Sequence, residues 1–247
     1  MPATSTNHSL GIPFIEIFSV ESTNNYAMQM AHNGFAADGL TILSSFQTAG
    51  KGQHNKSWHS KPDENILLSV IANARQMPVE NIFLLSMSVA LACAQSFKDH
   101  TGNTAYIKWP NDIYCNDKKA AGILVEPILR GGACQYAIIG VGMNINQETF
   151  ATDLEHAISM YMVSNTKKDI SSLAKLLKET IMESIHFSFA FPEKTVQLYN
   201  SLLYKKDDVA LFCIDKKTAP HKVLGVNKMG QIILDNDNKT YNYGDAV

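Results

Sequence analysis

The sequence predicts an α+β fold in which helices flank a mixed, largely antiparallel sheet and a small β-barrel follows toward the C-terminus. Three expected strands between residues 113 and 145 follow one another through tight turns, and such strands pair antiparallel. Segments with helical apolar spacing precede and follow these strands in the sequence. From residue 209 onward the chain has only short strands, broken by glycines and an Asn-Asp pair. A barrel of about forty residues is marginal alone, so we expect it to pack on the main domain.

Local signals set the ends of the expected elements. Ser22 is a suitable N-cap for the first helix, which Asn33-Gly34 ends. Pro78 opens a long apolar helix, and Gly102 lies beyond its end. In chain order, the sequence predicts strands at residues 14–18, 40–46, 65–72, 105–109, 113–115, 120–129 and 135–145, helices at 23–32, 79–97, 171–189 and 192–204, and short strands at 209–214, 222–226, 231–234 and 240–243.

Composition and charge describe an ordinary globular protein. At 247 residues the chain fits one good-sized domain, or one domain with a small appendage. A formal charge of −2 argues against a partner such as DNA that is bound by bulk electrostatics. The segment 1–11 lacks the pattern of a signal peptide, and we expect no apolar run long enough to span a membrane. The cysteines (Cys93, Cys115, Cys134 and Cys213) are scattered, which indicates free thiols in the reducing cytoplasm and no zinc site.

The segment 47–58 is a glycine-broken cationic loop. Gly50 and Gly52 let the backbone approach a ligand, while Lys51 and Lys56 add positive charge. A surface loop with solvated lysines is the alternative interpretation. The loop is not a phosphate-binding Walker A motif, because the required spacing is absent.

The segment Lys108-Trp109-Pro110-Asn111-Asp112 is more specific. Pro110 fixes the backbone and favours an extended Trp109. Asn111 and Asp112 then lie at a rigid bend, where a carboxylate can bind a Mg²⁺ that also contacts phosphate oxygens. A simple Asx turn is the alternative.

Three further positions carry candidate chemistry. Lys119 precedes small residues that leave room for a bulky ligand, although a lone lysine at a strand start is usually solvated. The hydroxyls of Ser22-Thr23 can bind a carbonyl or amide of a ligand, or merely cap a helix. Asn144 has an amide that can recognise an adenine edge, or that forms a turn. The preceding Gly-Val-Gly is not a dinucleotide motif, because no third glycine or helix follows it.

These motifs stand in the order and at the spacing found in biotin–protein ligases, that is, biotin–[acetyl-CoA-carboxylase] ligases, which the chain resembles over roughly Phe14 to Asn146. The resemblance implies the class II synthetase-like catalytic fold of biotin and lipoyl ligases and a C-terminal SH3-like domain. We therefore expect a tail at 1–12, a catalytic domain at 13–203 and an SH3-like domain at 204–247. About a dozen residues precede the first strand, so the chain resembles the monofunctional class without a DNA-binding domain. The motifs that carry the resemblance are Ser22-Thr23-Asn24, Gln47 to Gly52 with Trp58, Lys108 to Asp112, Lys119 to Glu126 and Gly140 to Asn144.

The resemblance implies an ATP-dependent reaction in two steps. The biotin carboxylate attacks the α-phosphorus of ATP, which gives biotinyl-5′-adenylate and pyrophosphate. A lysine of a biotin carboxyl carrier domain then attacks this anhydride to form an amide. The implied ligands are ATP, biotin and Mg²⁺, and the implied partner is the carrier, with no DNA or membrane partner and with a homodimer left open.

The resemblance also implies a role for each site residue. Lys119 is the catalytic residue, offsetting charge in the transition state, and Asp112 is the metal ligand. Biotin-binding residues are Ser22, Thr23, Asn24, Gln47, Gly50, Lys51, Gly52, Gln53, Trp109 and Gly122. ATP-binding residues are Lys56, Trp58, Lys108, Asn111 and Asn144, with Trp58 and Asn144 facing the adenine.

One position departs from the family pattern. Many members read Gly-Arg-Gly-Arg in the cationic loop, and the second Arg helps to retain the adenylate, whereas this chain has Gln53. Glutamine supplies no charge, so we hypothesise that Lys56 or His54 compensates in part. A lipoyl or octanoyl ligase and a non-catalytic biotin-binding regulator are the rival functions. A strand edge at 133–146 is a further expectation, as a surface for dimerisation or carrier docking.

Overall fold

A computed structural model describes residues 13–53, 56–235 and 239–245 of the chain. The expected tail at 1–12 and the hypothesised contribution of His54 lie outside these residues. The main domain contains β1 (Phe14–Val20), α1 (Thr23–His32), β2 (Thr41–Gln47), β3 (Asn65–Asn73), the 3₁₀ turn η2 (Val79–Asn81), α2 (Phe83–Thr101), β4 (Tyr106–Lys108), β5 (Asp112–Cys115), β6 (Lys118–Arg130), β7 (Ala133–Asn144), the 3₁₀ turn η3 (Thr152–Leu154), α3 (Met160–Ser164), α4 (Ile170–Ala190) and α5 (Pro192–Ser201). The C-terminal part contains β8 (Val209–Ile214), β9 (Lys217–Val226), β10 (Ile232–Leu234) and β11 (Thr240–Tyr241).

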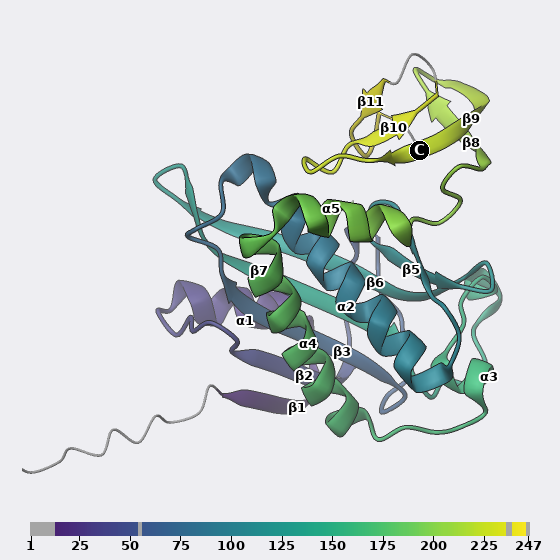
Figure 1. The fold of residues 1–247 in the computed structure, drawn as a ribbon. Helices are drawn as coiled ribbons and strands as arrows, with labels where there is room; N and C mark the ends of the chain where they lie inside the picture. The colour runs from purple at the N-terminus through teal and green to yellow at the C-terminus, as the bar shows by residue number, and fades with distance from the viewer. Residues whose placement is uncertain (1–12, 54–55, 236–238, 246–247) are drawn as a thin grey trace, which may run out of the picture.

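The main sheet confirms the predicted fold class. Its seven strands lie in the order β1-β2-β3-β7-β6-β5-β4. The β1–β2 pair is parallel, and every other neighbouring pair in this sheet is antiparallel. The sheet is therefore mixed and largely antiparallel, with α2, α4 and α5 layered over the face shown in Figure 1.

Each face of the sheet has its own apolar core. Along β3, Val70 and Ala72 belong to the larger cluster with α2 and α4, while Ile71 between them belongs to the cluster with α1. Successive side chains of a strand point to opposite faces, so α1 covers the face opposite to α2 and α4. The start of α1 is thereby held against β2, β3 and β7.

The helix α2 is the core helix of the larger cluster. The region Val79–Thr101 is long and apolar enough to cross a membrane by length and composition, with a mean hydropathy of 1.3, which corrects the expectation that no segment passes that test. Its most apolar window is 61% buried inside the protein, so packing against the sheet accounts for its composition. Gly102 ends the helix with φ of 74°, as the sequence predicts.

Several boundaries differ from the expectations. Pro78 leads into the turn η2, and the helix starts only at Phe83, rather than at residue 79. The strand expected at 222–226 begins at Lys217, because Asp215 and Lys216 adopt positive φ and make a two-residue hairpin turn. The equivalent Asn116-Asp117 turn was expected, and both residues also have positive φ.

The strand β7 does not form an edge. It pairs with β3 from Asn65↔Asn144 to Asn73↔Tyr136 and with β6 on its other side. The expectation that 133–146 offers an exposed edge is therefore wrong, because the long-range partner β3 covers it. At the far end of the sheet, Ile107 of β4 exchanges backbone hydrogen bonds of 2.8 Å with Leu202 and Tyr204.

The C-terminal strands form a separate antiparallel sheet in the order β11-β10-β9-β8. It lies above α5 in Figure 1. Asn200 at the end of α5 holds it in place, because its amide donates to the Val226 carbonyl at 2.9 Å and accepts from the Val226 N–H at 2.8 Å. The small β module thus packs on the main domain, as predicted.

All four cysteines are free thiols, in agreement with the sequence. Cys93, Cys115 and Cys134 are buried, and burial raises the pKa of each of these thiols. Cys213 on β8 is half-buried.

Candidate functional site

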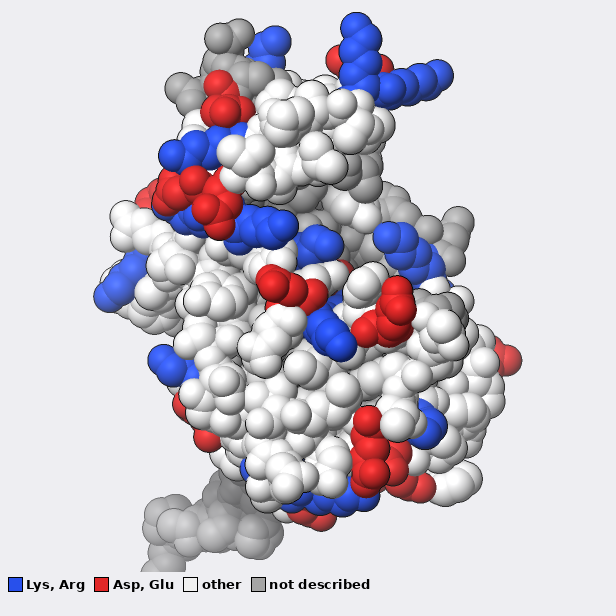
Figure 2. All heavy atoms as spheres, turned by 90° about the vertical axis from the view of Figure 1, so that its right-hand side faces the viewer, with Lys and Arg blue, Asp and Glu red and all other residues white. Residues whose placement is uncertain are grey.

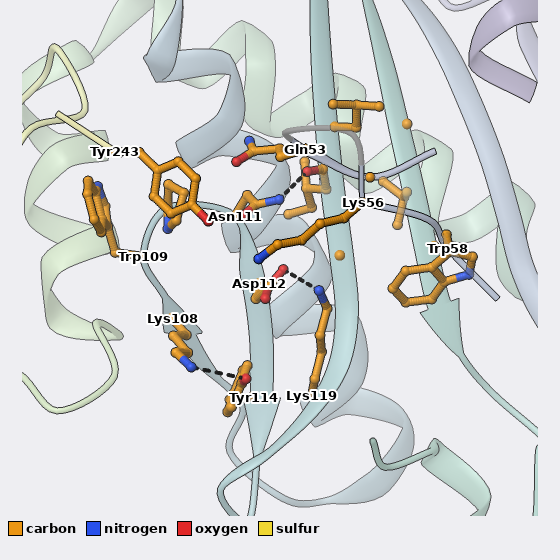
Figure 3. A pocket seen from close by; sticks show the side chains of 18 of the residues that line it. Gln53, Lys56, Trp58, Lys108, Trp109, Asn111, Asp112, Tyr114, Lys119 and Tyr243 are labelled. Atoms are coloured by element: carbon orange, nitrogen blue, oxygen red, sulfur yellow. Dashed lines mark hydrogen bonds and ion pairs between the residues drawn. The ribbon is translucent and has the colours of Figure 1, made fainter. Parts of the chain in front are cut away.

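A cavity of about 650 Å³ lies between the main sheet and the C-terminal sheet. The start of α1, the loop 47–58, strands β4 to β7 and the C-terminal sheet all contribute to its wall. Figure 3 shows part of this lining. Most of the expected site residues line it, although Gly50 and Asn144 do not. Those in the lining are Ser22, Thr23, Asn24, Gln47, Lys51, Gly52, Gln53, Lys56, Trp58, Lys108, Trp109, Asn111, Asp112, Lys119 and Gly122.

Lys119 and Asp112 form an ion pair in this cavity. Lys119 Nζ lies 2.7 Å from Asp112 Oδ1, and the two side chains are 35% and 22% exposed. Asp112 of β5 pairs in register with Gly122 of β6, not with Lys119. The Lys119 side chain reaches Asp112 by extending over Gly122, where an added Cβ would lie 3.4 Å from Lys119 Nζ. Figure 3 shows the Lys56 ammonium pointing toward the same pair. The arrangement gathers cations around one carboxylate, as a polyanionic ligand with a metal ion requires.

The start of α1 forms a hydrogen-bonded wall. The Gln47 Oε1 accepts from Thr23 N at 2.7 Å and lies 3.1 Å from Thr23 Oγ1. Ser22 caps the helix, and its Oγ accepts from the Asn25 N–H at 3.5 Å. Three residues of this wall, Ser22, Thr23 and Asn24, are buried. Their hydrogen bonds are therefore shielded from bulk water, which strengthens them.

The cationic loop is a small hairpin. Gly52 N donates to the Lys56 carbonyl at 2.7 Å, and Trp58 N donates to the Gly50 carbonyl at 2.9 Å. A Cβ on Gly50 would lie 2.5 Å from the Trp58 carbonyl oxygen, so this glycine permits the close approach of the two loop arms. Gly50 therefore shapes the loop rather than lining the cavity.

Trp58 lies on a floor of glycines. A Cβ on Gly142 would overlap the indole ring, and a Cβ on Gly122 would lie 3.0 Å from it. The Lys119 ammonium is 5.7 Å from the ring centroid. The glycines of β6 and β7 thus clear space for an aromatic ring beside the ion pair, a role that the sequence did not reveal.

Trp109 joins the main domain to the C-terminal sheet. Its Nε1 donates to the Gly230 carbonyl at 2.8 Å, and its ring lies 5.5 Å from that of Tyr243, edge to face. Tyr243 itself lines the cavity. Trp109 therefore has a structural role at this junction, and its expected role in covering a ligand stays a prediction.

We expect Trp109→Phe to lower the free energy of unfolding by about 0.5–1.5 kcal/mol, because the Gly230 carbonyl loses its donor while the aromatic packing stays. Denaturant unfolding monitored by circular dichroism measures the change. Trp58→Phe is the matched control, since the buried Trp58 Nε1 has no hydrogen-bond partner in the part of the chain that the structure describes. Equal destabilisation by both variants would contradict the prediction.

The side-chain amides of two expected site residues, Asn144 and Asn111, donate hydrogen bonds to backbone carbonyls. Asn144 Nδ2 donates to the carbonyls of Lys119 and Ile158 at 3.3 and 3.2 Å. Asn111 Nδ2 donates to the Ile123 carbonyl at 2.7 Å. Asn144 therefore supports the strand that carries Lys119, and in this structure its amide nitrogen does not face the cavity.

An aromatic cluster at the cavity wall was not foreseen. Lys108 Nζ lies 3.2 Å from the Tyr114 hydroxyl, and the Tyr114 ring lies 5.3 Å from that of Tyr204. The Tyr204 hydroxyl donates to Asp117 at 2.6 Å. Burial, together with this hydrogen bond, raises the pKa of Tyr204 to about 12. The cluster joins residues up to 96 positions apart, so no local motif announces it.

The Asp112 carboxylate is the candidate ligand for a metal ion in this cavity. Asp112 Oδ1 is buried, and within residues 13–53, 56–235 and 239–245 its partner is the Lys119 ammonium at 2.7 Å. The same described ranges hold no cluster of three or more His, Cys, Asp or Glu. Mg²⁺ is commonly held by one or two carboxylates together with substrate phosphates, so this donor set fits Mg²⁺ that arrives with a nucleotide.

The cavity beside the mixed sheet, with its ion pair beside a hydrogen-bonding helix start, has the groups that a binding site for a small polar molecule beside an anionic group requires. The chain belongs to the Biotin/lipoate A/B protein ligase family, whose model matches residues 17–144.

Curated relatives agree with this assignment. The bifunctional ligase/repressor BirA of Escherichia coli is 26% identical over 224 residues, which cover 88% of this chain and 68% of that protein. The biotin–[acetyl-CoA-carboxylase] ligase of Mycobacterium tuberculosis is 30% identical over 70% of this chain and 64% of its own length. BirA of Bacillus spizizenii is 34% identical over 61% of this chain, and the match spans only 46% of that protein, about half its length.

A solved structure shares the fold over almost the whole chain. The biotin protein ligase of Aquifex aeolicus, in complex with biotin and ATP, has a TM-score of 0.81 and 20% identity, covering 95% of this chain and 97% of that one. The likeness extends through the C-terminal sheet and confirms the α+β architecture.

Proposed function

We propose that the protein is an ATP-dependent biotin–protein ligase, which makes biotinyl-5′-adenylate and transfers biotin to a lysine of a biotin carboxyl carrier domain. The observation that carries the proposal is the Lys119–Asp112 pair, 2.7 Å apart, in a cavity that also holds the polar start of α1. Relatives that are named biotin ligases, and a structural neighbour that binds biotin and ATP, support the choice of substrates.

In this proposal biotin lies in the part of the cavity between the start of α1 and the cationic loop. Ser22, Thr23 and Gln47 hold the ureido ring, because they offer hydroxyl and amide groups on one buried wall. Asn24, with Lys51 and Gln53 of the loop, completes this end, and Trp109 and Gly122 border the valeryl chain. The biotin carboxylate then points toward Lys119.

ATP occupies the cationic end of the cavity in this proposal. The ammonium groups of Lys56, Lys108 and Lys119 approach the phosphates, and Asp112 orients Mg²⁺ on them. Mg²⁺ supplies charge neutralisation for the phosphates when bound. Trp58 contacts the adenine in this proposal, and Asn111 lies beside the metal ion. Both residues line the cavity.

The two steps balance without an enzyme nucleophile. A biotin carboxylate oxygen bonds to the α-phosphorus as the bond to pyrophosphate breaks. The neutral amine of the carrier lysine then bonds to the acyl carbon, loses a proton, and AMP leaves. Lys119 at the junction of carboxylate and phosphate stabilises the charge that develops there, and the cavity holds the reactants in position.

One assay separates the proposal from its rivals. The protein is incubated with ATP, Mg²⁺, a carrier domain and either biotin or lipoate, and the carrier is weighed by mass spectrometry. A mass gain with biotin alone supports the biotin ligase. A gain with lipoate alone identifies a lipoyl ligase, and no gain despite biotin binding identifies a non-catalytic binder. The proposal also places the protein in the cytoplasm, and sedimentation velocity tests for a homodimer.

We expect Gln53→Arg to slow the escape of biotinyl-adenylate from the protein by about tenfold, since an added guanidinium can pair with the phosphate of the adenylate. Gln53 lines the cavity, so the new charge has access to the ligand. Release of radiolabelled adenylate in a filter assay measures the escape rate.

Gln197→Arg adds the same charge on the exposed side of α5 and serves as the control for this prediction. An unchanged escape rate in Gln53→Arg would mean that this position does not contribute to retention in this chain.

A further inference from the structure

Glu126 on β6 lies behind the hydrogen-bonded wall at the start of α1 and is not part of the cavity lining. Its Oε2 accepts a hydrogen bond of 2.7 Å from Asn24 Nδ2, which also lies 3.5 Å from the Leu124 carbonyl. An ionised carboxylate only accepts hydrogen bonds. Glu126 therefore fixes which end of the Asn24 amide faces it, and turns the amide oxygen the other way.

The fixed orientation of the Asn24 amide determines which acceptor receives the hydrogen bond from the Ser69 hydroxyl. The Asn24 Oδ1 lies 2.6 Å from Ser69 Oγ, which is also 2.8 Å from Thr23 Oγ1. A serine hydroxyl has one proton, and an amide oxygen can only accept, so the Ser69 proton goes to Asn24. The Thr23 hydroxyl then receives no proton from Ser69.

The same direction of hydrogen-bond donation fixes the donors and acceptors that face the cavity. With no proton from Ser69, Thr23 Oγ1 donates to Ser69 or Gln47 and keeps lone pairs to accept from a ligand N–H. The Gln47 Oε1 is held as an acceptor by Thr23 N at 2.7 Å, which leaves its amide nitrogen as a donor for a ligand carbonyl. The wall thus offers one acceptor and one donor side by side, the complement of a cyclic urea.

We propose that Glu126 is a positioning residue, which sets the donor and acceptor pattern of the ureido site through Asn24, Ser69 and Thr23. The inference rests on the proposed function, because it assumes that the ligand of this wall is biotin. Three buried residues carry the effect, and Glu126 itself touches no substrate. The Gly140 backbone also packs closely against the Asn24 side chain, since a Cβ on Gly140 would overlap it. This contact helps to hold Asn24 in its orientation.

The test compares Glu126→Ala with Glu126→Gln. In Glu126→Ala the Asn24 amide can turn over, so we expect the KM for biotin to rise about tenfold, with the KM for ATP and kcat near those of the wild type. Glu126→Gln retains an oxygen that accepts from Asn24 Nδ2, and it should restore most of the affinity. Calorimetric titration with biotin measures binding apart from turnover.

A biotin derivative methylated on a ureido nitrogen gives a second readout. The wild type should bind it at least about tenfold more weakly than biotin, because the Thr23 acceptor loses its donor. In Glu126→Ala this preference should shrink. A merely structural role of Glu126 would leave the preference unchanged. Glu16→Ala is the matched control, since Glu16 accepts from Ser171 and Lys175 at 2.9 and 3.0 Å on the exposed surface.

Specific outcomes overturn the inference. The inference is wrong if Glu126→Ala binds biotin as tightly as the wild type does. It is also wrong if Glu126→Ala and Glu126→Gln lose the same biotin affinity, or if Glu126→Ala weakens biotin and ATP binding equally. If the wild type itself fails to bind biotin, the proposed function falls together with this inference. Biotin binding by the wild type with an unaffected Glu126→Ala removes the inference alone.

Discussion

Lys119→Ala is expected to slow biotinyl-adenylate formation by about 10²–10³-fold, the usual effect of removing one preorganised charge stabiliser from an enclosed site. Lys119 Nζ lies 2.7 Å from Asp112 and borders the space where carboxylate and phosphate must meet. Without the ammonium, two anionic reactants approach each other beside an uncompensated carboxylate. Biotin-dependent pyrophosphate exchange into ATP measures this step directly.

The controls separate chemistry from folding. Lys167→Ala removes a lysine from another ion pair, with Glu148 at 3.0 Å, that is exposed and is not part of the cavity lining. It should exchange pyrophosphate at the wild-type rate. Lys119→Arg keeps the charge but changes its shape, and partial activity is expected. Wild-type exchange by a folded Lys119→Ala variant would remove this residue from the mechanism.

Gly140→Ala is expected to destabilise the protein by about 2–5 kcal/mol and to abolish tight biotin binding, since it combines overpacking with broken buried hydrogen bonds. The new Cβ would overlap the Asn24 side chain, which is buried and bonded to Ser69 and Glu126. Thermal unfolding and calorimetric titration with biotin measure the two effects.

The double variant Gly140→Ala/Asn24→Ala tests the cause of the predicted loss. Removing the Asn24 amide relieves the overlap, so stability should recover in part while biotin affinity stays low. The two substitutions touch one contact and should therefore be strongly non-additive. A Gly140→Ala variant as stable as the wild type would contradict the geometry of this contact.

The parts of the fold that follow from local chemistry were predictable. The helix Thr23–His32 has a cap at Ser22 and a stop at Asn33, and both signals lie within its own segment. The turn at Asn116-Asp117 has residues that tolerate positive φ. The alternation of antiparallel strands followed from such turns, and the sheet class was correct.

The parts that depend on distant partners were not predictable. The 133–146 strand was taken for an edge because its partner β3 lies about seventy residues away. The turn at Asp215-Lys216 lacks the glycine or asparagine that announces such turns, so β9 was expected to start too late. At the site, the resemblance implied that Lys119 and Asp112 share one cavity, whereas nothing in the sequence indicated that Tyr204 and Tyr243 enter it from the C-terminal part.

Acidic and basic side chains both occur on the face of the molecule shown in Figure 2. Near the boundary between the C-terminal sheet and the main domain, basic side chains lie close to acidic ones (Figure 2). The mixed pattern on this face agrees with the formal charge of −2.

The distribution of thiols has a practical consequence. Three of the four cysteines are sealed in the core, and only Cys213 is partly open to solvent. Because thiolates are the reactive form, an alkylating fluorophore should attach to β8 in preference to the other sites. The native chain thus carries its own handle for optical spectroscopy, from which the position of the C-terminal sheet can be followed as ligands bind.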